Sequence, residues 1–106
     1  MTDRELLELA AKAAGIELHW EHDRPQRIEL FRGHLPNFED WNPLTDDGDA
    51  LRLAVRLHMS VLSNETASWV ATGMHQIVRA EEHHDGKDPY AATRRAIVRA
   101  AAEMAK

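Results

Sequence analysis

Residues 41–53 constrain the fold most, because they join a loop to the start of a helix. Pro43 disfavours helical backbone at the residue before it. Thr45 or Asp47 can then serve as the N-cap, since a side-chain oxygen at that position accepts backbone N–H groups. Negative charge is favoured at the start of a helix, and three aspartates lie there: Asp46, Asp47 and Asp49. A helix is therefore predicted from about residue 47 to residue 57.

Two further helices are predicted, one near each end of the chain. Thr2 and Glu5 have the spacing of a capping box, and Gly15 can adopt the left-handed conformation that ends a helix. Near the other end, Asp88 is a suitable N-cap and Pro89 a suitable first helical residue. We expect an apolar face on this last helix, formed by Tyr90, Ile97, Ala101 and Met104.

Alternating apolar and polar residues predict a hairpin after the first helix. Leu18 and Trp20 alternate with polar residues, residues 23–26 favour a turn, and a second strand around Ile28 and Leu30 ends near Gly33. Residues 33–46 contain glycine, proline and asparagine, which favour loops. They are predicted to form a long ordered loop that docks Phe38 and Trp41 onto the core.

Further strands are predicted after the second helix. Met59 and Val61 alternate with polar neighbours, and residues 63–65 favour a turn. Residues 69–78 are rich in strand-forming types, and they predict two β segments around Thr72 and Gly73. Residues 81–87 are predicted to form a charged surface loop.

The order of these elements predicts an α+β fold in a single domain, residues 1–106. We expect an antiparallel sheet of four to five short strands, arranged as hairpins, with three helices on one face in the order α-β-β-α-β-β(-β)-α. A chain of 106 residues suits one core. The other sheet face would be partly solvated, so an exposed tryptophan there, Trp20 or Trp69, would mark a partner site.

Composition excludes several classes of protein. Hydrophobic residues make up 43% of the chain and charged residues 29%, as in ordinary globular proteins. No apolar run approaches the ~20 residues of a membrane span, and no signal peptide is visible at the start. The absence of cysteine excludes disulfides and thiolate metal sites and fits a reducing compartment. We therefore predict a cytoplasmic protein that does not contact membranes.

Three segments carry a family resemblance: residues 1–10 (MTDRELLELA), 41–55 (WNPLTDDGDALRLAV) and 89–103 (PYAATRRAIVRAAAE). Together they resemble small phage and prophage accessory proteins of the NinX-like type. The resemblance covers under half of the chain and includes no catalytic motif. Residues 21–40 and 56–88 have no counterpart. The resemblance implies that the shared segments are scaffold and that the unmatched middle, residues 56–88, contains the part specific to this chain's task.

The polar residues do not predict a catalytic or metal site. His83 and His84 have acidic neighbours, but adjacent histidines in a strand point apart, and a solvated loop gives metal ligands no rigid frame. Ser60, Ser63 and Ser68 lack the Gly-x-Ser-x-Gly pattern of a nucleophile elbow. No metal, no cofactor and no enzymatic activity are therefore predicted.

These observations favour a binding protein that acts by contact with a host protein. Its most concrete form is an inhibitor of a bacterial defence complex, of the anti-CRISPR type, a step that rests on the resemblance, size and charge. The acidic stretch could compete with nucleic acid for a basic groove, because opposite potentials steer association. The predicted partner-binding residues are Glu39, Asp40, Asp46, Asp47, Asp49, Trp69, Arg95 and Arg99.

Alternative functions remain open. Arg94, Arg95 and Arg99 could contact phosphates in a nucleic-acid-binding or regulatory module, although the net charge of −5 argues against a broad nucleic-acid surface. A solvated helix face, partly paired with Glu103, is the simpler interpretation of the same arginines. A metal-dependent enzyme ranks third. A homodimer could form through an apolar edge containing Trp69, Val70 and Ile77.

Overall fold

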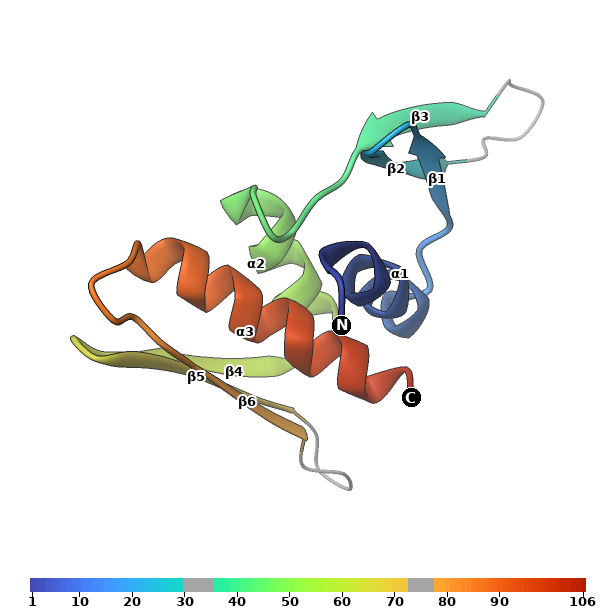
Figure 1. Ribbon diagram of the computed structural model, residues 1–106. Coiled ribbons are helices and arrows are strands. Elements are labelled where there is room, and N and C mark those ends of the chain that lie inside the picture. The colour runs from blue at the N-terminus through green and yellow to red at the C-terminus, as the bar shows by residue number, and fades with distance from the viewer. Residues whose placement is uncertain (30–35, 73–77) are drawn as a thin grey trace.

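The computed structural model describes residues 1–29, 36–72 and 78–106. Within these ranges the chain has an α+β fold with three helices and two three-stranded antiparallel sheets, and the helices lie between the sheets (Figure 1). The predicted fold class is confirmed. The predicted single sheet of four to five strands is wrong, because the first hairpin pairs with a strand inside the predicted loop instead of joining the later strands.

Helix α1 spans Asp3–Ala14, and both of its predicted ends are confirmed. The Thr2 hydroxyl accepts the backbone N–H of Glu5, whose carboxylate returns to Thr2 as in a capping box. Gly15 ends the helix with φ 71°, a left-handed conformation that glycine adopts without steric cost. The helix packs along α3 through a buried apolar stripe: Leu6, Leu7, Ala10, Ala11 and Ala14.

Helix α2 spans Asp47–Arg56, so the predicted helix is confirmed. Its N-cap is Asp46, and neither Thr45 nor Asp47 takes that position, because the Asp46 carboxylate accepts the N–H of Asp49 at 2.8 Å. The helix ends in a tight connection at His58, with φ 56°, and strand β4 follows directly. α2 and β4 consequently diverge from a shared corner.

Helix α3 spans Pro89–Met104 and lies at the centre of the fold (Figure 1). Asp88 is the N-cap and Pro89 opens the helix, as predicted. The buried part is rich in alanine, which allows α1, α2 and the sheet to approach closely. The predicted apolar face is correct only in its middle, since Ile97 and Ala101 are buried whereas Tyr90 and Met104 are exposed.

The larger sheet consists of β4 (Met59–Ser63), β5 (Ala67–Thr72) and β6 (Val78–His83), with β5 in the middle. α3 covers one face of this sheet (Figure 1). The predicted turn at Gly73 lies outside the described residues. The prediction of a surface loop at residues 81–87 is wrong for its first half, because β6 continues to His83 and orients Glu82 toward α3.

The smaller sheet consists of β1 (Leu18–Glu21), β2 (Arg24–Glu29) and β3 (Asn37–Asp40). Its first turn is at His22 and Asp23, not at residues 23–26, because His22 takes a left-handed φ of 56°. β3 lies within the predicted loop, and the predicted strand end at Leu30 and Gly33 lies outside the described residues.

Two aromatic residues predicted to dock onto the core behave differently. Trp41 is 3% exposed and belongs to the core, as predicted. Phe38 is exposed on β3, where it contacts the ring of His19 edge-on at 5.1 Å, so the prediction for Phe38 is wrong. In the described parts of the chain, none of the helices is long and apolar enough to cross a membrane.

Candidate functional site

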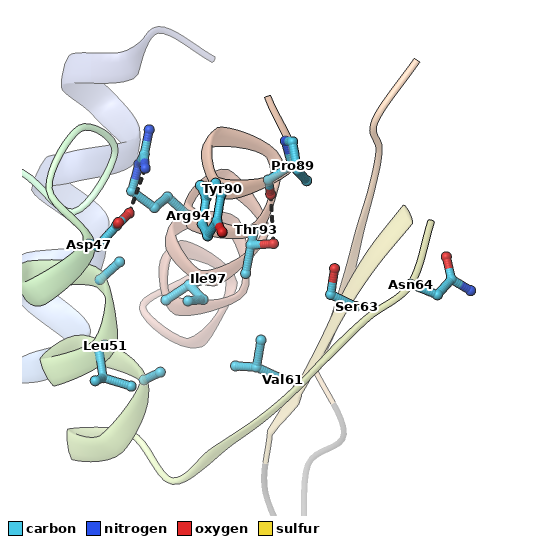
Figure 2. A pocket seen from close by; sticks show the side chains of 12 residues that line it. Asp47, Leu51, Val61, Ser63, Asn64, Pro89, Tyr90, Thr93, Arg94 and Ile97 are labelled. Carbon is cyan, nitrogen blue, oxygen red and sulfur yellow. Dashed lines mark hydrogen bonds and ion pairs between the residues drawn. The ribbon is translucent and has the colours of Figure 1, made fainter. Parts of the chain in front are cut away.

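An open groove of about 650 Å³ lies between α2, α3 and β4 (Figure 2). It follows from the divergence of α2 and β4 after the turn at His58. Leu51, Val61 and Ile97 point toward the same space from the three elements. The groove is mainly apolar, and the complete lining is Asp47, Ala50, Leu51, Ala54, Val61, Ser63, Asn64, Pro89, Tyr90, Thr93, Arg94 and Ile97.

The groove is bounded by large apolar side chains that face water. Leu51 on α2 is 64% exposed and Tyr90 on α3 is 68% exposed. Val61 on β4 is 43% exposed, whereas Ala50 and Ala54 are buried beneath the rim. Single exposed apolar residues are common, but a contiguous apolar surface in a groove is typical of binding sites. This surface is the strongest candidate functional site of the described residues.

One end of the groove is polar, because it lies over a chain of hydroxyl groups. The Ser68 Oγ is 3.1 Å from the Ser63 Oγ and 2.6 Å from the Thr93 Oγ1. Its third neighbour is the Nε2 atom of His84, at 3.0 Å. Ser63 and Thr93 line the groove, whereas Ser68 and His84 are buried behind them. The hydroxyl chain thus gives the apolar groove a hydrogen-bonding end.

The Ser68–His84 pair resembles part of a catalytic dyad but has a structural environment. Ser68 is 0% exposed, so a substrate has no access to its hydroxyl. The Nδ1 of His84 lies 3.3 Å from the backbone carbonyl of Glu65, where a triad would place a carboxylate. The pair satisfies buried polar groups at the junction of β5, β6 and α3.

Sequence reasoning missed both the groove and the pairing of Ser68 with His84. Only the position of Ser68, opposite Ser63, had a signal in the sequence. Asn64 favours a turn, and its Oδ1 accepts the N–H groups of Thr66 and Ala67. A hairpin closed there places Ser63 opposite Ser68. The position of α3 above them depends on packing that no local pattern contains.

Two of the predicted acidic residues lie on β3 and are paired with arginines of β2. Glu39 accepts the Nε–H of Arg27 at 3.0 Å, and Asp40 lies 3.3 Å from the Nε of Arg24. The hydrogen bond with Glu39 raises the pKa of Arg27 above its usual value, so this guanidinium stays charged throughout the accessible pH range. The pairs hold the edge strand of the smaller sheet.

The other three predicted acids lie at the start of α2. Asp46 is the N-cap, and Asp47 forms an ion pair of 2.6 Å with Arg94 (Figure 2). Asp49 is buried, and its carboxylate accepts the N–H of Asn42 at 3.0 Å and a guanidinium N–H of Arg52 at 2.8 Å. The structure therefore separates the five acids into two groups, each engaged in internal contacts.

The predicted basic residues of α3 are also engaged internally. Arg99 donates to Glu82 at 2.6 Å and to the carbonyl of Glu81 at 2.9 Å. Arg95 lies 3.0 Å from Asp3 and 3.4 Å from Glu82. These contacts fasten α3 to β6 and to α1, and they reduce the positive charge that the helix presents to solvent. The proposed pairing of the arginines with Glu103 is replaced by these contacts.

Trp69, the remaining predicted site residue, is half-buried on the central strand β5. It lies opposite Leu62 on β4 and Glu81 on β6, on the sheet face away from α3. Val70 points to the other face and is 1% exposed, so β5 does not supply the predicted apolar edge. Ile77 lies outside the described residues.

Adjacent His83 and His84 have different surroundings. His83 lies 3.5 Å from Glu81 on the surface, whereas His84 points inward to Ser68. In residues 1–29, 36–72 and 78–106, there is no group of three or more histidine, aspartate or glutamate side chains placed to hold a metal ion.

Comparisons with known proteins give no family assignment. No protein-family model matches the chain, and no curated protein matches it significantly. The resemblance to NinX-like phage proteins therefore stays a prediction.

Proposed function

We propose that this chain is a non-catalytic binding protein, and that the groove between α2, α3 and β4 contacts its protein partner. The observation that carries the proposal is the apolar rim of the groove, where Leu51 of α2 and Tyr90 of α3 face water. Burial of such side chains contributes about 25 cal/mol per Å² of apolar surface, and buried aromatic residues often dominate binding.

The most concrete form of this proposal is inhibition of a bacterial defence complex, of the anti-CRISPR type. Its support is the resemblance of residues 1–10, 41–55 and 89–103 to phage accessory proteins, together with the small size of the chain. Two of these segments, 41–55 and 89–103, supply most of the groove lining, so in this proposal they make the contact in addition to the scaffold role that the resemblance implies. In the nucleic-acid alternative, Arg95 and Arg99 would have to leave their partners Glu82 and Asp3 to contact phosphates. Contact with a protein through the groove requires no such rearrangement, because Leu51 and Tyr90 are already exposed.

The test is an affinity capture from bacterial lysate with matched variants. Leu51→Lys combined with Tyr90→Lys places charge on the rim at exposed positions, so the fold is retained. The control is Asp40→Asn, which changes an acidic residue far from the groove. We expect the unmodified chain and the control to retain the same stoichiometric partner, and the rim variant to lose it. Equal retention by the rim variant, or no partner for any of the three proteins, would contradict the proposal.

A plaque assay tests the defence form separately. The chain is expressed in a bacterium with an active CRISPR defence, and the plating efficiency of a targeted phage is measured. We expect plating to rise with the unmodified chain and not with the rim variant. If a partner is captured but plating does not rise, the proposed contact through the groove stands and the anti-CRISPR form of the proposal is rejected.

A further inference from the structure

The larger sheet has one protected edge and one unprotected edge. Strand β6 carries four charged or titratable residues, Arg79, Glu81, Glu82 and His83. Strand β4, at the opposite edge, reads Met-Ser-Val-Leu-Ser and has neither a charge nor a proline. Both edges of the smaller sheet carry acidic residues. Because charged residues on edge strands prevent pairing with other chains, β4 stands out among the edges of the described sheets.

The hydrogen-bond pattern shows which backbone groups of β4 point outward. The N–H of Asn64 donates to the carbonyl of Ala67 at 3.0 Å, so these two residues form a bonded pair. Bonded and non-bonded pairs alternate along an antiparallel ladder. Ser60 and Leu62 therefore bond to β5, and three residues direct their N–H and C=O groups away from it: Met59, Val61 and Ser63. No other strand of the described residues lies beside them.

Apolar side chains accompany this free edge. Leu62 is 66% exposed on one face of β4. On the other face, α2 leaves Val55 66% exposed. A stable dimer needs about 800 Å² of buried surface on each partner, more than one short strand provides. Val55, four residues before the start of β4, adds apolar surface beyond the strand itself.

We propose that β4 pairs antiparallel with β4 of a second copy, about a two-fold axis at Val61. Val61 would then face Val61 of the second copy, and Met59 would face Ser63, so that the outward backbone groups of each strand meet. A second copy fits this edge because the two-fold axis opposes each residue to a residue of the same uncharged strand, so the paired strands bring no like charges together. The larger sheets of the two copies then become one continuous sheet, and the helix α3 that covers each of them lies on the same face of it.

The inference goes beyond the proposed function, since it concerns the purified chain alone. The axis is perpendicular to the joint sheet, so the grooves of the two copies open on the same face of the assembly.

The test combines sedimentation with hydrogen exchange on the purified full chain. We expect the mass to rise with concentration from the 12.0 kDa monomer to twice that value. Val61→Lys opposes two like charges at the axis and should keep the chain monomeric, whereas Glu81→Lys on the protected edge should leave the dimer intact. Because Val61 is 43% exposed, lysine is tolerated there, and circular dichroism verifies the fold.

Hydrogen exchange keeps the proposal falsifiable if the variant misfolds. In the unmodified chain, protection of the Met59, Val61 and Ser63 amides should increase with concentration, while Ser60 and Leu62 are protected at every concentration. A chain that stays monomeric over a wide concentration range would overturn the proposal, as would a dimer in which the Val61 amide exchanges freely. If the Val61 amide is protected only in the presence of a captured host protein, the edge belongs to that partner, and the proposed pairing of two copies is overturned as well. None of these outcomes depends on the rim variant, so the proposed function is tested separately.

Discussion

Replacement of Asp49 by alanine tests whether the acidic stretch is structural. The Asp49 carboxylate is buried and accepts the N–H of Asn42 at 3.0 Å, and this contact joins the loop after β3 to the start of α2. Removing the acceptor leaves a half-buried N–H without a partner, which costs about 1–3 kcal/mol. The lost contact with Arg52, whose side chain is mostly exposed, adds at most about 0.5 kcal/mol.

The sum, about 2 kcal/mol, corresponds to a decrease in Tm of roughly 10 °C for a domain of this size. Thermal unfolding followed by circular dichroism measures it. Asp49→Asn keeps an acceptor and should lose about half as much. Asp40→Ala removes only exposed contacts, an ion pair with Arg24 and a long hydrogen bond from Gln26, so its Tm should change by no more than about 2 °C. If Asp49→Ala unfolds at the same temperature as Asp40→Ala, the structural role of Asp49 is refuted.

Four further substitutions test other parts of the structure. Ser68→Val should cost about 2–4 kcal/mol, because it leaves buried polar partners, including His84, unsatisfied; urea unfolding measures this, and an unchanged midpoint would contradict the buried network. Glu82→Gln should cost about 0.5–1 kcal/mol at low salt and less at high salt, since it removes the carboxylate shared by two arginines; a salt-independent loss would refute an ionic origin. Leu53→Ala should cost about 2–5 kcal/mol, because Leu53 is fully buried, whereas Leu51→Ala should cost less than about 0.5 kcal/mol; equal losses in calorimetry would contradict the exposed rim.

The helices were predictable because their signals are local. Thr2 with Glu5, Gly15, and Asp88 with Pro89 each act within one turn of helix, and the structure confirms all of these caps. The second helix was found by the same logic, but its N-cap was misplaced by one residue. Thr45 or Asp47 is the N-cap that the sequence predicts, but Asp46 between them has an equally suitable side chain, and only the three-dimensional path of the loop selects it.

The sheets and the site were less predictable because they depend on distant segments. β3 has only four residues, and its pairing with β2 is carried by contacts such as Glu39 with Arg27. The groove arises from the angle between α2 and β4, which the single residue His58 sets through its left-handed backbone. Tyr90 follows the helical spacing of core residues, yet it precedes the part of α3 that the other elements cover.

Site-specific photo-crosslinking tests most directly whether the groove carries the contact. A photoreactive amino acid is placed at position 51 on the groove rim in one protein and at position 40 on β3 in another, and each is irradiated in bacterial lysate. If the groove carries the contact, position 51 gives one covalent protein adduct and position 40 gives none. An adduct from position 40 alone, or none from either position, would contradict the proposed contact.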